Sequence, residues 1–131
     1  MTMRNGRRCS SATAFLKPAR GRSNLQIFTG AKTLGLVMEG RRAAGIRVRR
    51  GNEEIKVRAR REVVLSAGSL GSPHILMLSG IGAGAELSAH GIEVVHDLVG
   101  VGKNLRDHLQ ARPVYKTMMS TINSETRHPL Q

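Results

Sequence analysis

Residues 63–82, which read VVLSAGSLGSPHILMLSGIG, decide the fold of this chain. The unbroken aliphatic run 63–65 predicts a buried strand within residues 62–66. Ser72 suits the N-cap of a short helix, and Pro73 suits its first position, where a missing N–H costs nothing. Gly80 can adopt the left-handed conformation that ends such a helix. The stretch therefore predicts a strand that enters a helix through a Gly-Ser loop, the kind of junction where α/β proteins bind ligands.

The residues on either side of this stretch predict strands before it and a second short helix after it. Apolar alternation and turn residues predict a strand over 33–39 and a hairpin of 44–50 with 53–59 around Gly51 and Asn52. After the central helix we expect a helix over 84–90 and a strand over 92–95. We therefore expect an α/β, or mixed α+β, fold with a β-meander, short helices and an incomplete sheet, which indicates part of a larger domain.

Positive charge is concentrated in the first half of the chain. The net charge is +12, but residues 1–61 carry +13 and residues 62–131 carry −1. Within the predicted hairpin, Lys and Arg alternate with Ile and Val, which predicts one solvated cationic face and one aliphatic face. A basic nucleic-acid-binding module stays an alternative function. Since no aromatic residue lies among these cations to stack on a base, we expect no nucleic-acid partner.

The sequence contains no pattern for disulfides, metal binding or membrane insertion. Cys9 is the single cysteine among 131 residues, and the histidines lack the spacing of a zinc-binding helix. No apolar run approaches the roughly 20 residues of a membrane span. The basic N-terminus has no apolar segment of the kind that secretory signals carry. We expect a cytoplasmic protein without a metal.

The central stretch resembles the second signature of the glucose-methanol-choline (GMC) family of FAD-dependent alcohol oxidoreductases. The matching residues are Gly68, Ser72–Pro73, Leu76–Met77 and 79–82. The resemblance covers residues 5–115 in order, including a glycine-turn segment that ends in Asn-Leu-x-Asp-His. It leans towards choline dehydrogenase-like members.

The resemblance implies a cofactor, a reaction and a set of cofactor-binding residues. The family uses FAD, and it oxidises a small-molecule alcohol by transferring hydride from the CH–OH group to the flavin. Residues 1–113 would be the rear part of the FAD-binding domain, and residues 114–131 would begin the substrate domain, poorly ordered from about residue 117. The implied cofactor-binding residues are Ala31, Thr33, Ala67, Gly68, Ser72, Pro73, Asn104 and His108.

The Asp107-His108 pair has two interpretations. Either Asp107 caps a turn and His108 packs at a domain junction, or the loop that carries both residues borders a cofactor or substrate cavity.

Two hallmarks of the family are absent from this sequence. It has no N-terminal G-x-G-x-x-G unit and no C-terminal catalytic histidine, so no residue is assigned a catalytic role. The chain resembles an internal fragment, and we expect it to be inactive alone and to need a partner fragment. A non-functional remnant of a truncated gene is the other alternative.

Overall fold

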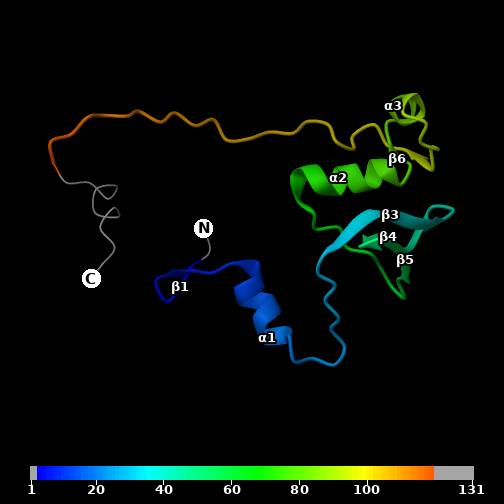
Figure 1. Ribbon diagram of the computed structural model, residues 1–131. Helices are drawn as coiled ribbons and strands as arrows, with labels where there is room; N and C mark the ends of the chain where they lie inside the picture. Colours follow the sequence, from blue (N-terminus) through cyan, green and yellow to red (C-terminus); the bar gives the residue numbers. More distant parts are fainter. Residues whose placement is uncertain (1–2, 120–131) are drawn as a thin grey trace.

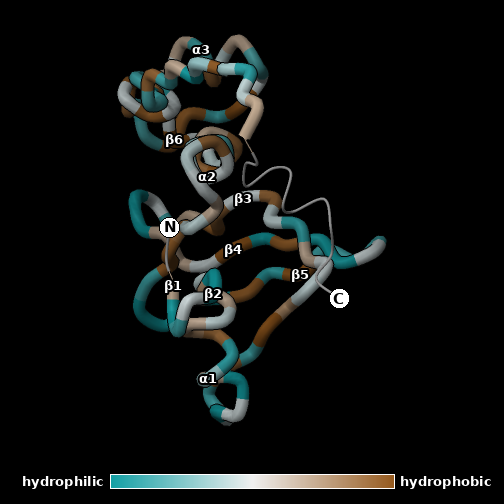
Figure 2. Tube along the Cα trace, turned by 90° about the vertical axis from the view of Figure 1, so that its left-hand side faces the viewer, coloured by the Kyte–Doolittle hydropathy of each residue, from teal (hydrophilic) through white to brown (hydrophobic). Residues whose placement is uncertain are grey.

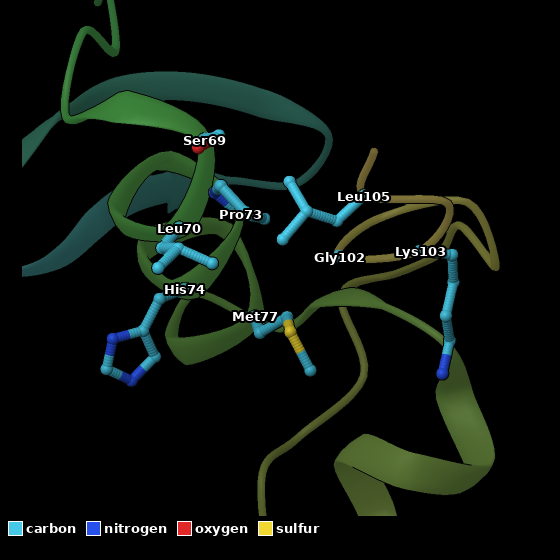
Figure 3. Close-up of a pocket in the computed structure, with 8 residues that line it drawn as sticks. All are labelled: Ser69, Leu70, Pro73, His74, Met77, Gly102, Lys103 and Leu105. Atoms are coloured by element: carbon cyan, nitrogen blue, oxygen red, sulfur yellow. The ribbon is translucent and has the colours of Figure 1, made fainter. Parts of the chain in front are cut away.

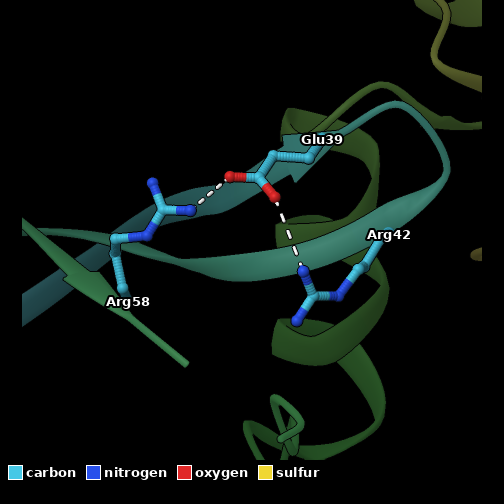
Figure 4. Close-up of polar contacts among 3 residues, drawn as sticks. All are labelled: Glu39, Arg42 and Arg58. Carbon is cyan, nitrogen blue, oxygen red and sulfur yellow. Dashed lines mark hydrogen bonds and ion pairs between the residues drawn. The ribbon is translucent and has the colours of Figure 1, made fainter. Parts of the chain in front are cut away.

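A three-stranded antiparallel meander is the most regular part of the molecule. The computed structural model describes residues 3–119. Strands β3 (Ala31–Glu39), β4 (Arg42–Arg50) and β5 (Glu53–Arg58) pair in sequence order. The predicted strand 33–39 and the hairpin that follows are therefore confirmed. At the first turn, Glu39 bonds both Arg42 and Arg58, which ties the turn to the far strand (Figure 4).

The N-terminal region forms small local elements. Strands β1 (Met3–Arg4) and β2 (Arg7–Arg8) form a hairpin whose turn residues, Asn5 and Gly6, both have positive φ. An Asn-Gly pair favours this turn because both residues tolerate that conformation. A π-helical stretch, η1 (Ala12–Leu16), continues into the short helix α1 (Lys17–Ala19) (Figure 1).

Helix α2 (Gly68–Leu78) lies against the meander, and a smaller βαβ unit lies beyond it. In that unit β6 (Ile81–Gly82) and β7 (His96–Asp97) pair in parallel, with helix α3 (Gly84–Ala89) between them in sequence. Figure 2 shows the resulting layers: the three strands, then α2, then β6 with α3. The predicted helix 84–90 is confirmed. The structure therefore has the expected mixed α/β character with short helices and small sheets.

Ser79 joins α2 to the meander. Its hydroxyl accepts a hydrogen bond from the buried amide of Leu36 at 2.7 Å and donates one to the carbonyl oxygen of Ile75 at 2.6 Å. Leu36 lies just after an irregularity in the pairing of β3 with β4, between Thr33 and Gly35. The serine therefore supplies the acceptor for an amide that would otherwise be buried without one.

Three predictions around the central stretch are wrong. Residues 62–66 lie in no strand, and the side chain of Val64 is 73% exposed. Helix α2 begins at Gly68 rather than Pro73, so Pro73 lies inside it. The third error is the strand over 92–95, since β7 begins only at His96.

Two of these errors, the strand over 62–66 and the start of α2, have a clear physical reason. An extended aliphatic segment becomes a strand only if another strand pairs with it, and residues 62–66 find no such partner among the residues described. Ser72 does not cap the helix from outside; its hydroxyl turns back within the first turns and accepts the N–H of Ala67 at 3.0 Å.

The two faces of the meander differ from each other as the alternation predicts, but the cationic face is not wholly solvated. On the aliphatic face Ala44 and Val48 are buried. On the opposite face a Cβ atom at Gly35 would lie 3.5 Å from the guanidinium of Arg47 and 3.7 Å from the carbonyl oxygen of Leu78 in α2. The cations therefore face a helix as well as water.

After residue 102 the chain is extended and exposed as far as the structure describes it. Figure 1 shows this yellow-to-orange segment leaving the side of α2 and α3. Leu109 and Val114 are essentially fully exposed. The predicted boundary at residue 114 stays a prediction, and most of the segment expected to be poorly ordered lies outside the described residues.

Among residues 3–119 the buried apolar core is small. Its fully or nearly buried members are Cys9, Leu36, Ala44, Val48 and Leu87. The same part of the chain contains no helix that is long and apolar enough to cross a bilayer.

Candidate functional site

A cavity of about 250 Å³ lies between α2 and the loop that follows β7. Figure 3 shows the helix contributing one wall and the loop the other. The lining residues are Ser69, Leu70, Pro73, His74, Met77, Gly102, Lys103 and Leu105.

Helical spacing explains why these α2 residues share one wall. Leu70, Pro73 and Met77 are three and four residues apart, so they lie on one face of the helix. The loop approaches this face closely at Gly102, which has φ +75° and where a Cβ atom would lie 3.4 Å from the sulfur of Met77. The cavity is therefore walled by apolar groups on both sides.

The start of α2 adds polar groups to the cavity. Pro73 has no N–H, so the carbonyl oxygen of Ser69, four residues earlier, lacks its usual helical donor. Ser69 lines the cavity, so this residue adds polar atoms beside the apolar wall. The first turn of α2 therefore offers hydrogen-bonding groups to a ligand as well as an apolar surface.

Lys103 lies at the rim of the cavity and is held by an ion pair. Its ammonium group bonds the carboxylate of Glu86 in α3, and both side chains are about half exposed. The pair links the loop to α3. It also neutralises the lysine, so the cavity has no unpaired lysine charge to attract an anion.

Four predicted cofactor-binding residues lie at or near the start of α2. Pro73 lines the cavity, and Ala67, Gly68 and Ser72 form the bend and first turns of the helix. Gly68 has φ +85°, and a Cβ atom there would meet nothing within 4 Å. The backbone at this bend is thus open to a ligand.

The other four predicted residues are more widely distributed. Asn104 stands in the loop between two lining residues and has φ +56°. Ala31 and Thr33 lie on β3, and Thr33 lines a different cavity on the sheet side of α2.

The remaining predicted residue, His108, does not line the α2 cavity. It is exposed, and its N–H bonds the side chain of Asp107 at 2.7 Å. Because the chain is extended over residues 103–116, this contact between adjacent residues caps no turn, and both interpretations of the Asp107-His108 pair stay predictions.

The prediction from sequence missed all of the cavity wall except Pro73: Ser69, Leu70, His74, Met77, Gly102, Lys103 and Leu105. A signal for the α2 members was available. With the helix placed from Gly68, the spacing of residues 70, 73, 74 and 77 marks one helical face. Placing the helix start at Pro73 hid that pattern. Among residues 3–119, no group of three or more metal-ligating side chains gathers at this or any other place.

Comparison with known proteins places the chain in a family. The GMC oxidoreductase family model matches residues 1–110. Oxygen-dependent choline dehydrogenase from Brucella anthropi is 51% identical over 109 residues, which are 83% of this chain and 20% of that protein. Alcohol dehydrogenase [acceptor] from Pseudomonas putida is 44% identical over 128 residues, 96% of this chain and 22% of that protein.

Solved structures give the same result. Pyridoxine 4-oxidase from Mesorbium loti matches with a TM-score of 0.66 and 41% identity, covering 72% of this chain and 19% of that one. An FAD-dependent oxidoreductase from Chaetomium thermophilum matches with a TM-score of 0.60 and 35% identity, over 63% of this chain and 14% of that one. The chain thus spans about a fifth of the length of the curated relatives it matches. Because the family model matches most of its residues, this chain belongs to the GMC oxidoreductase family.

Proposed function

We propose that the cavity between α2 and the 102–105 loop is the flavin-facing wall of an FAD-dependent oxidoreductase acting on the CH–OH group of an alcohol. One observation carries the proposal. Leu70 and Leu105, which line the cavity from its two sides, are 71% and 63% exposed although they are large and apolar. Exposed apolar side chains that converge on one cavity are typical of a ligand site.

The residues present fit the chemistry of a flavin ring. Such a ring has apolar faces and polar edges. The cavity offers apolar side chains from α2 and the loop, with polar atoms of Ser69 beside them. The open backbone at Gly68 adds a place where a ligand can approach without meeting a side chain.

When bound, FAD supplies the hydride acceptor, and the chain's own residues hold and shield it. Leu70, Met77 and Leu105 exclude water from the apolar faces. Ser69 fixes orientation through hydrogen bonds. The pair of Lys103 with Glu86 keeps the loop against α3 and so maintains the cavity wall. We assign the base that takes the alcohol proton to no described residue.

The substrate class comes from the relatives. Their names, choline dehydrogenase and alcohol dehydrogenase, support choline or another small primary alcohol as the substrate. We also propose a cytoplasmic location, a reducing setting in which the free thiol of Cys9 would stay reduced.

A further protein part completes the enzyme in this proposal. The chain exposes 11998 Å² of surface, whereas a compact monomer of 14.2 kDa exposes about 6,800 Å². Since the chain also spans about a fifth of its relatives' length, we propose that it does not turn over alcohol by itself.

Flavin titration tests the cavity. FAD is added to the purified chain, and quenching of flavin fluorescence is measured. Leu70→Ser and Leu105→Ser should each weaken binding about fivefold, since partial burial of a leucine contributes about 1 kcal/mol. Leu109→Ser is the matched control, because this leucine is exposed and does not line the cavity. Equal weakening by all three variants, or no quenching by the unaltered chain, would rule out this cavity as the flavin site.

Turnover is a separate measurement. The chain with FAD, choline or a primary alcohol, and an artificial electron acceptor should give no reduction of the acceptor. Reduction that depends on the alcohol would show that the chain needs no further protein part.

A further inference from the structure

A second cavity lies on the other side of α2, between the helix and the cationic face of the meander. Its volume is about 370 Å³, within the range of roughly 300–1,000 Å³ that small-molecule sites occupy. The sheet contributes Lys32, Arg47, Arg49 and the acidic Glu54, and the helix contributes Ile75 and Leu78. The sheet wall therefore carries a net positive charge, and the helix wall is apolar.

The strand register concentrates positive charge in this cavity. Lys32 of β3 lies directly opposite Arg49 of β4. Like charges that are directly opposite in an antiparallel pair destabilise the sheet. An anion bound between the two side chains would offset that repulsion.

The nearby acid does not neutralise this pair. Glu54 lies opposite Arg49 in the register, but its carboxylate pairs with Arg47 at 3.3 Å. Among the described residues, neither Lys32 nor Arg49 takes part in an ion pair, while three of the arginines around them in the meander do. The cavity therefore retains about two uncompensated positive charges.

We propose that this cavity binds an organic monophosphate, with its phosphate between Lys32 and Arg49 and its apolar part against Ile75 and Leu78. A phosphate dianion matches two cations, and a guanidinium can bond two of its oxygens at once. The two helix residues provide the apolar contact that inorganic phosphate cannot use. The exposed imidazole of His74 lies at the rim and also borders the flavin-facing cavity.

Binding of phenyl phosphate to the full chain, measured by calorimetry without flavin, tests the proposal. Phenyl phosphate should bind more tightly than inorganic phosphate because of its ring, and benzyl alcohol should not bind. Lys32→Gln and Arg49→Gln should each weaken phenyl phosphate binding roughly tenfold, since each removes a charge-assisted hydrogen bond. Both side chains are exposed, so both variants should fold, which circular dichroism checks.

Lys56→Gln is the matched control. Lys56 belongs to the same sheet face, opposite Arg47, but it does not line the cavity. Its replacement should change the affinity less than twofold. An equal loss of affinity in Lys56→Gln would indicate that the whole basic face attracts the phosphate. Absence of phenyl phosphate binding by the unaltered chain would mean that Lys32 and Arg49 only contact solvent. Either result overturns the proposal.

Competition with FAD separates this site from the proposed flavin site, because Thr33, an expected cofactor-binding residue, also lines this cavity. Phenyl phosphate should bind equally with and without FAD. Displacement by FAD would make the cavity part of the flavin site and overturn a separate phosphate site. Failure of FAD to bind in the fluorescence titration would leave this result unaffected.

Discussion

The meander and the segment that follows it both contain many aliphatic residues, but only the meander forms strands. Strands β3, β4 and β5 pair with sequence neighbours across short turns, so their backbone groups find partners locally. Residues 62–66 include three consecutive aliphatic residues, yet they form no strand, and Val64 is 73% exposed. The difference teaches that apolar character alone does not make a strand, since each strand also needs a partner.

The largest expected loss of stability comes from a substitution within the meander itself. A Cβ atom at Gly45 would lie 2.2 Å from the carbonyl oxygen of Val57, so Gly45→Ala must displace β5. We expect a loss of about 3 kcal/mol in the free energy of unfolding, measured by urea denaturation. Gly21→Ala is the control, because its Cβ atom would meet nothing within 4 Å and its φ is not positive. Similar midpoints for the two variants would contradict the close packing of β4 on β5.

The second prediction concerns the hydrogen bond that joins helix α2 to the meander. Ser79→Ala leaves the buried amide of Leu36 without its acceptor and should cost about 2 kcal/mol. Urea denaturation of this variant is compared with that of Ser88→Ala, which changes an exposed serine on α3. If both substitutions have the same small effect, Ser79 does not hold α2 to β3.

A smaller loss of stability is expected when the contact at the start of helix α3 is removed. The carboxylate of Asp97 accepts the N–H of Gly84, the first residue of α3, at 2.8 Å. Asp97→Ala should lower stability by about 1 kcal/mol, as the loss of a helix cap does, and Asp97→Asn should retain most of it. Thermal unfolding followed by circular dichroism measures both. Equal losses would mean that charge rather than capping geometry matters here.

The smallest expected effect on stability gives the most direct test of the difference between the meander and residues 62–66. Val64→Ser should change the stability of this chain by less than about 0.5 kcal/mol, because the side chain is already exposed. Amide hydrogen exchange should be fast over residues 62–66 and slow in β4. Slow exchange at Val64, or a loss of about 2 kcal/mol in the variant, would show that this segment is a buried strand after all.

Sequence reasoning succeeded where structure depends on near neighbours. The turn at Gly51, the alternation along β4 and the helix before Gly91 are all local features, and each was placed correctly. The family resemblance was also correct, because it depends on residue types in order and not on contacts.

It failed at the start of α2 and where contacts reach across the chain. The start of α2 depends on a hydroxyl that bonds five residues back, which favoured Gly68 over Pro73. The cavity walls bring Met77 against Gly102, and no local pattern indicates that approach. The cationic face was predicted, but the helix that lies on it was not, since Arg47 and Leu78 are 31 residues apart in the sequence.

The hydrogen bond between Ser79 and Leu36 also sets an order of events during synthesis. The two residues are separated by 43 positions, so the ribosome completes the whole meander before the acceptor for the Leu36 amide exists. At about 5–20 residues per second, roughly 2–9 s pass between the synthesis of Leu36 and that of Ser79, and during this time the Leu36 amide is open to water or to a chaperone.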